Sequence, residues 1–132
     1  MQHHFRKISI ILISALVVLA AGCRSNPVIN VEEAAIVTGK SQASMDEVKS
    51  AITRAGVSLG WIMKPTGTGS MVATLNLRQH VAVVDIKYNT KTYSIIYQSS
   101  QNLKYDGQNI HKNYNSWVQH LNQAIQSQLS AI

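Results

Sequence analysis

The sequence has one cysteine and few acidic residues, and both shortages limit the functions that the protein can have. A single thiol cannot form a disulfide within the chain, so a disulfide-stabilised scaffold is excluded. Only six Asp and Glu residues occur along 132 positions, and no spacing brings two of them together as a glycoside hydrolase requires. We therefore expect a protein without enzymatic activity and without a cofactor, in a chain long enough for one domain.

The start of the chain has the three parts of a secretory signal peptide. Residues 1–7 are polar and end with Arg6 and Lys7, and residues 8–21 are apolar apart from two serines. A basic start, an apolar centre and small residues before a cleavage point are typical of signal peptides. The apolar stretch is shorter than the roughly 20 residues that a membrane-spanning helix needs. We predict that residues 1–22 are removed.

The end of this segment reads Leu19-Ala20-Ala21-Gly22-Cys23 and resembles the lipobox of bacterial lipoprotein precursors. The family usually has Leu three positions before the cysteine, where this chain has Ala20. The resemblance implies cleavage between Gly22 and Cys23, a diacylglycerol group on the Cys23 thiol and an acyl chain on the new amine. Lipidation would explain an odd thiol in an exported protein, and stable anchoring takes more than one acyl chain.

The residue after the cysteine indicates whether the inner or the outer membrane is the expected location. In Gram-negative lipoproteins an Asp at this position causes retention in the inner membrane, and this chain has Arg24. The resemblance therefore implies the outer membrane, with the protein facing the periplasm. After the signal, ten basic and six acidic residues remain, and the basic ones are scattered, so we expect no nucleic-acid partner. The expected partners are membrane lipid, through acylated Cys23, and a protein or other envelope component.

The stretch after the cysteine predicts a tether followed by a helix. Residues 23–43 contain an Asn-Pro step and then several aliphatic residues, which are typical of a partly extended tether whose second half pairs as an edge strand. Ser44 and Glu47 match a capping box. Apolar residues at helical spacing then predict a helix over about 45–55, which ends at Gly56.

The rest of the chain predicts strands and then a second helix. Alternating apolar and polar residues indicate strands near 57–63, 70–78, 81–88 and 92–99, with a turn at 65–69. A long apolar stripe predicts a helix over about 110–130, with Asn109 as its cap. Residues 44–132 should therefore form one α+β domain, an antiparallel sheet of three to five strands with both helices on one face.

The sheet face away from the helices is more apolar than a surface that only meets water. Its predicted members are Val72, Thr74, Arg78, Val81, Val83, Asp85, Lys87, Thr92 and Ile96. An exposed apolar patch of this kind needs an explanation. Two explanations stay open: residues 28–37 cover the face, or a partner does.

The candidate binding surface combines a loop with a nearby turn. Its predicted residues are Arg78, His80, Tyr105 and His111. A metal site is not expected, because zinc needs three or four ligands. His111 and His120 lie nine positions apart, on opposite sides of the predicted helix.

The sequence as a whole predicts a non-enzymatic outer-membrane lipoprotein that binds a partner or serves the envelope as an accessory module. The alternative is a periplasmic domain that binds a small ligand or a glycan, with hydrolase activity as its less favoured form. This alternative predicts a concave pocket near Tyr105, His111 and Arg78.

Overall fold

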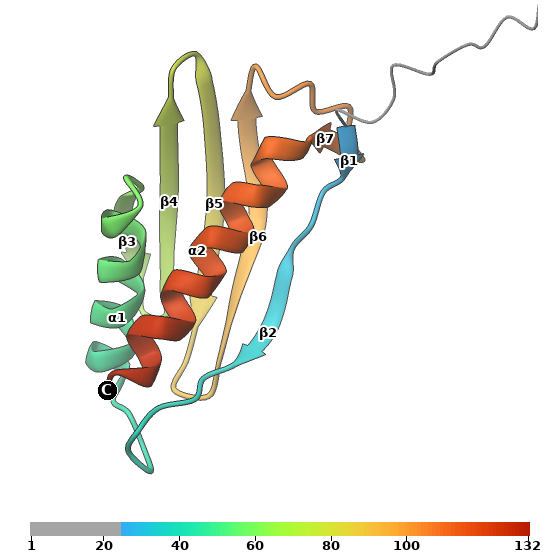
Figure 1. Cartoon of the computed structure of the whole chain (residues 1–132). Helices are drawn as coiled ribbons and strands as arrows, with labels where there is room; N and C mark the ends of the chain where they lie inside the picture. Colours follow the sequence, from blue (N-terminus) through green and yellow to red (C-terminus); the bar gives the residue numbers. More distant parts are fainter. Residues whose placement is uncertain (1–24) are drawn as a thin grey trace, which may run out of the picture.

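Two long helices lie beside a five-stranded antiparallel sheet in the computed structural model, which describes residues 25–132 (Figure 1). The predicted signal peptide, the cleavage point at Gly22, Cys23 and Arg24 lie outside the described residues. The elements in chain order are β1 (Ser25–Pro27), β2 (Val31–Ala35), α1 (Met45–Ser58), β3 (Ile62–Gly67), β4 (Ser70–Leu77), β5 (His80–Tyr88), β6 (Thr92–Gln101), β7 (Asn109–His111) and α2 (Lys112–Ser130).

The large sheet has the strand order β2-β6-β5-β4-β3, and β1 forms a separate two-stranded ribbon with β7. Strands β3 to β6 pair in sequence because the turns between them are short, which favours antiparallel neighbours. Strand β2 adds to the free edge of β6. The predicted α+β class with an antiparallel sheet is confirmed.

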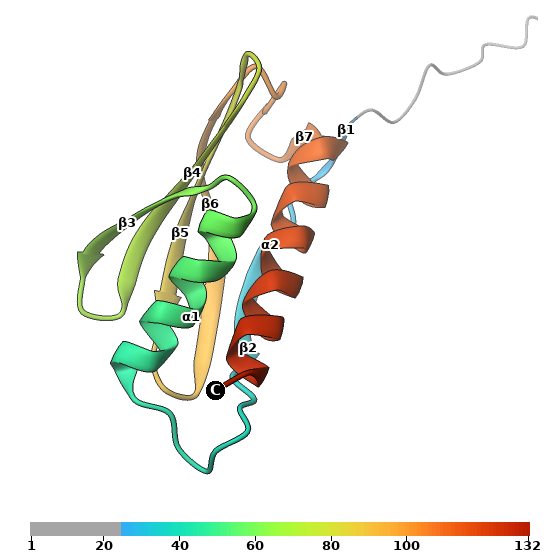
Figure 2. The same ribbon diagram turned by 60° about the vertical axis from the view of Figure 1, so that its left-hand side comes forward.

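The core lies between the sheet and the helices. In both views α1 and α2 are on the same side of the five-stranded sheet (Figures 1 and 2). Every second residue of the central strands is buried in one cluster with the helices, as strand periodicity requires. The largest of its fully buried side chains include Ile52, Met71, Ile86, Tyr93, Ile95, Tyr114, Leu121 and Ile125.

Helix α1 begins as predicted and ends later than predicted. Ser44 Oγ accepts a hydrogen bond from Glu47 N (3.1 Å), and the Glu47 side chain accepts one from Ser44 N (3.2 Å), so the capping box is confirmed. Gly56 does not stop the helix but lies buried within it. A Cβ there would come 2.1 Å from Met63 Sδ, so Gly56 permits the close approach of β3.

Two further boundaries differ from the prediction. Strand β3 continues through Pro65, which we had placed in a turn, because β3 is an edge strand and its outer side needs no amide donor. Asn109 does not cap α2, since it pairs with Pro27 in the β1–β7 ribbon. The N-cap is His111, whose Nδ1 accepts a hydrogen bond from Asn113 N (3.1 Å).

The segment that we expected to be a tether is held along much of its length. Strand β2 pairs with β6 at the sheet edge, and Ile36 N donates to Lys91 O (2.8 Å). The start of the segment is held too, because β1 pairs with β7 and Val28 N donates to Gln108 O (3.0 Å). The folded part therefore includes residues ahead of the predicted boundary at 44.

The sheet face away from the helices is not covered by residues 28–37. Strand β2 extends the sheet sideways and does not lie over this face, so the idea that residues 28–37 cover it is wrong. Figure 2 shows no described element on that side of the sheet. Val72, Val83 and Ile96 are half-buried there, and Ile62 is 61% exposed.

Candidate functional site

Two of the four predicted site residues meet at one end of the molecule. His80 opens β5 and His111 closes β7, and their rings stack with centroids 6.5 Å apart and planes at 27°. The His80 ring also lies 6.1 Å from that of Trp117 on α2. His80 Nδ1 is 2.8 Å from the carbonyl oxygen of Asn102, so the ring is fixed from a third direction.

Tyr105 belongs to a second aromatic group at the same end. Its ring lies 4.3 Å from Tyr97, and Tyr97 meets Tyr114 edge-on at 5.5 Å. The group runs from solvent to core, because Tyr105 is 42% exposed and Tyr114 is fully buried. Burial, with a contribution from the neighbouring tyrosines, raises the pKa of Tyr114, so this hydroxyl stays protonated.

Arg78 is at this end but outside both ring groups. It occupies the β4–β5 turn with a positive φ of 57°, and the turn is held by Asn102 Nδ2, which donates to Gln79 O (2.6 Å). Within residues 25–132 the Arg78 guanidinium has no hydrogen-bond or ion-pair partner. Arg78 is therefore an exposed cation that makes no side-chain hydrogen bond or ion pair with the described part of the chain.

Strand β1 borders the histidine pair, because Ser25 is the strand partner of His111. The anchor of this strand is Asn115, which is only 6% exposed. Asn115 Oδ1 accepts from Ile29 N (3.0 Å), and Asn115 Nδ2 donates to Pro27 O (2.9 Å). Asn115 falls outside the apolar stripe of the helix in the sequence, and no local signal distinguishes it from an exposed asparagine.

We call this region the β1 end. It consists of residues 25–29, residues 78–80, residues 102–108, β7 and the first turn of α2. Strands β1 and β7, the β4–β5 turn and the start of α2 lie at the same end of the molecule in both views (Figures 1 and 2). Five hollows on residues 25–132 are lined by residues other than Arg78, His80, Tyr105 and His111. The nearest one lies between β1 and α2, next to Asn115 and Lys112.

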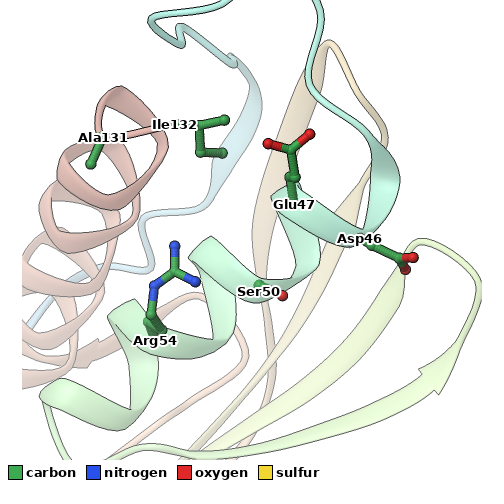
Figure 3. Close-up of a pocket in the computed structure, with 6 residues that line it drawn as sticks. All are labelled: Asp46, Glu47, Ser50, Arg54, Ala131 and Ile132. Atoms are coloured by element: carbon green, nitrogen blue, oxygen red, sulfur yellow. The ribbon is translucent and has the colours of Figure 1, made fainter.

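Another hollow lies between α1 and the end of the chain (Figure 3). Two of its charged groups serve the fold, since Arg54 Nε donates to Gln128 Oε1 (3.0 Å) and Glu47 pairs with Lys40 Nζ (2.8 Å). The hydrogen bond from Lys40, and then that from Ser44, lowers the pKa of Glu47. Figure 3 shows Asp46 and Glu47 extending in different directions, so these two carboxylates do not form a catalytic pair.

The expectation of a non-enzymatic protein took the Gly-x-Ser-x-Gly motif to be absent from the sequence, and this is wrong. Residues 56–60 read Gly-Val-Ser-Leu-Gly, which matches the nucleophile motif of α/β-hydrolases. That chemistry needs the serine on a sharp strand-to-helix turn, whereas Ser58 is the last residue of α1 and β3 follows it. Its Oγ donates to Ala55 O (2.7 Å), which is the bond of a serine at a helix end. In this chain the motif therefore marks the end of α1 and does not form a nucleophile turn.

Comparisons with protein-family models, with curated proteins and with solved structures found no match to this chain. Within residues 25–132, no three His, Cys, Asp or Glu side chains are grouped as metal ligands would be. The helices of that part are also too short or too polar to cross a membrane. Functional inference therefore depends on the sequence motif at Cys23 and on the geometry of the β1 end and the uncovered sheet face.

Proposed function

We propose that the protein is a lipoprotein of the outer membrane, facing the periplasm, and that it acts there as a non-enzymatic binding or accessory module. The observation that carries the proposal is the lipobox-like sequence that ends in Cys23, the one cysteine of the chain. Its position supports the proposal, because Cys23 precedes the first residue of β1 by two positions. A lipid on Cys23 would hold the folded domain directly at the membrane surface.

The mass of the N-terminal peptide tests the lipid. Processing predicts a peptide that begins at Cys23 and carries diacylglycerol and an amide-linked acyl chain. Cys23→Ser should leave the uncleaved precursor, because the thiol that receives the lipid is gone. A wild-type protein cleaved before Cys23 without added lipid mass would refute the lipoprotein assignment.

The residue after the cysteine tests the location. Arg24→Asp should move the protein from outer-membrane to inner-membrane fractions in a density gradient, whereas Arg24→Ser should leave it in the outer membrane. Both variants remove the positive charge of Arg24, and only Arg24→Asp supplies the Asp that causes retention, so a difference between them shows that loss of the positive charge is not the cause of the change in location.

The uncovered face supports the binding role. A photo-crosslinking residue at Val83 lies in the middle of this face, and one at Gln123 lies on the exposed side of α2. A partner that uses the face gives a specific adduct from Val83 and none from Gln123. Equal adducts from the two positions, or none from Val83, would count against a partner on this face.

A further inference from the structure

The path of the chain between Cys23 and the fold limits how the domain can sit on its membrane. Two residues of fully extended chain span at most about 7 Å. Ser25 is already in β1, which is paired with β7 and tied to α2 through Asn115. If Cys23 is lipidated, as proposed above, the β1 end must therefore lie within a few ångströms of the lipid headgroups, while the other end of the domain is free to point away.

The chemistry of the β1 end suits an anionic surface. Arg78, Lys104 and Lys112 are exposed, and within residues 25–132 none of them has an ion-pair partner. The one acidic residue of the 102–112 stretch, Asp106, accepts hydrogen bonds from Gln108 N and Asn109 N within its own turn, and these bonds lower its pKa. The surface of the β1 end therefore carries three basic side chains and one carboxylate among these residues.

The apolar groups at this end suit the headgroup layer as well. The side chains of Tyr105 and Ile29 are each 42% exposed. Tyrosine is enriched where proteins meet the membrane interface, because its ring is apolar and its hydroxyl remains hydrated.

We infer that the β1 end is a membrane-docking surface, which rests on anionic phospholipid headgroups and so gives the lipidated domain a fixed orientation. Basic residues near a membrane surface are attracted by anionic lipid over about a Debye length, and the short link to Cys23 holds the end of the molecule that carries these three residues towards the membrane. In this orientation α2 rises from the membrane, and the uncovered sheet face stands to the side, accessible to a periplasmic partner.

Depth-dependent quenching on the lipidated full-length protein tests the orientation. A lipidated Cys23 leaves an introduced cysteine as the only free thiol, so a fluorophore attaches at one place. Asn113→Cys lies at the β1 end of α2 and Ser127→Cys near its other end, about 21 Å along the helix axis. In phosphatidylethanolamine–phosphatidylglycerol vesicles with spin-labelled headgroups, we expect strong quenching at 113 and its near-complete loss at 127, because about 21 Å of helix separates the two positions.

Charge reversal tests the cause. Lys104→Glu with Lys112→Glu should bring the quenching at position 113 down towards that at 127. Lys64→Glu with Lys91→Glu changes the net charge equally, at exposed positions away from the β1 end, and should preserve the difference. Vesicles of phosphatidylcholine alone should also reduce the difference.

The outcomes separate the two proposals. Lipid on Cys23 together with equal quenching at 113 and 127 overturns the docking surface and leaves the lipoprotein assignment intact. An ordered difference that survives both charge reversal and phosphatidylcholine overturns recognition of anionic lipid. Absence of lipid on Cys23 overturns the proposed function and the docking surface with it.

Discussion

The hydroxyls of two buried tyrosines differ in their hydrogen bonding. Tyr114 has no partner for its hydroxyl within the described part of the chain, whereas Tyr93 donates to Asn122 Oδ1. Tyr114→Phe removes a group whose desolvation is not compensated, so we expect the free energy of unfolding to stay level or to rise by up to about 1 kcal/mol. Tyr93→Phe leaves a carbonyl oxygen unsatisfied and should lower it by about 1–2 kcal/mol. Urea unfolding at neutral pH measures both, and equal losses would contradict the assignment.

Buried tyrosines also give the stability a dependence on alkaline pH. Burial is the main cause that raises the pKa of Tyr88, Tyr93 and Tyr114 above the ordinary value. Above about pH 10 the unfolded chain releases these protons while the folded chain keeps them, so the stabilisation is complete below that pH and is lost as the pH rises. Tyr114→Phe removes one such group and should make the decline shallower by up to about 1.4 kcal/mol per pH unit. Urea titrations from about pH 9 to 11 check this slope.

At the scale of elements, local sequence patterns predicted most of the helices and strands. The capping box at Ser44 and the alternation along β4, β5 and β6 depend on neighbours in sequence, so they are readable from it. The errors arose where distant contacts decide. Gly56 stays helical because Met63 packs against it, and β3 contains Pro65 because its outer edge is free.

The β3–β4 turn provides a test at this scale. Gly69 has a φ of +69°, and a Cβ there would lie 2.5 Å from the backbone oxygen of Tyr88. Gly69→Ala should therefore cost about 2 kcal/mol or more, because backbone strain and a clash with a neighbouring strand add together. Gly107 has a φ of +99° with open space around it, so Gly107→Ala should cost only about 1 kcal/mol. Thermal or urea unfolding compares the two, and a smaller loss at Gly69 would refute the close contact.

At the scale of the whole molecule, the candidate site shows where sequence reasoning ends. Arg78, His80, Tyr105 and His111 were chosen as polar residues of adjacent loops, and the structure places all four at the β1 end. The stacking of His80 on His111 spans 31 positions and depends on how β5 and β7 are placed by the packing of the sheet against α2. No spacing rule contains that information, and the same holds for the hydrogen bonds of Asn115.

The two faces of the sheet should tolerate a charged residue to different degrees. Two neighbouring isoleucines of β6 allow the same substitution to be tested on each face. Ile95 is 1% exposed and belongs to the core, while the adjacent Ile96 is half-buried on the uncovered face. Ile95→Lys would bury an unpaired charge, so we expect loss of the folded state or a cost above about 3 kcal/mol. Ile96→Lys lets the ammonium reach water and should cost less than about 1 kcal/mol.

The Ile96→Lys variant also tests whether a partner binds to the uncovered face. Circular dichroism and urea unfolding establish that Ile96→Lys is folded, and crosslinking from Val83 then reports on the partner. A charge in the middle of an apolar contact must be desolvated, so the adduct should be lost although the fold persists. Thr92→Lys, at the start of the same strand, is the matched control and should keep the adduct. An unchanged adduct in Ile96→Lys would contradict a contact that depends on the apolar centre of this face.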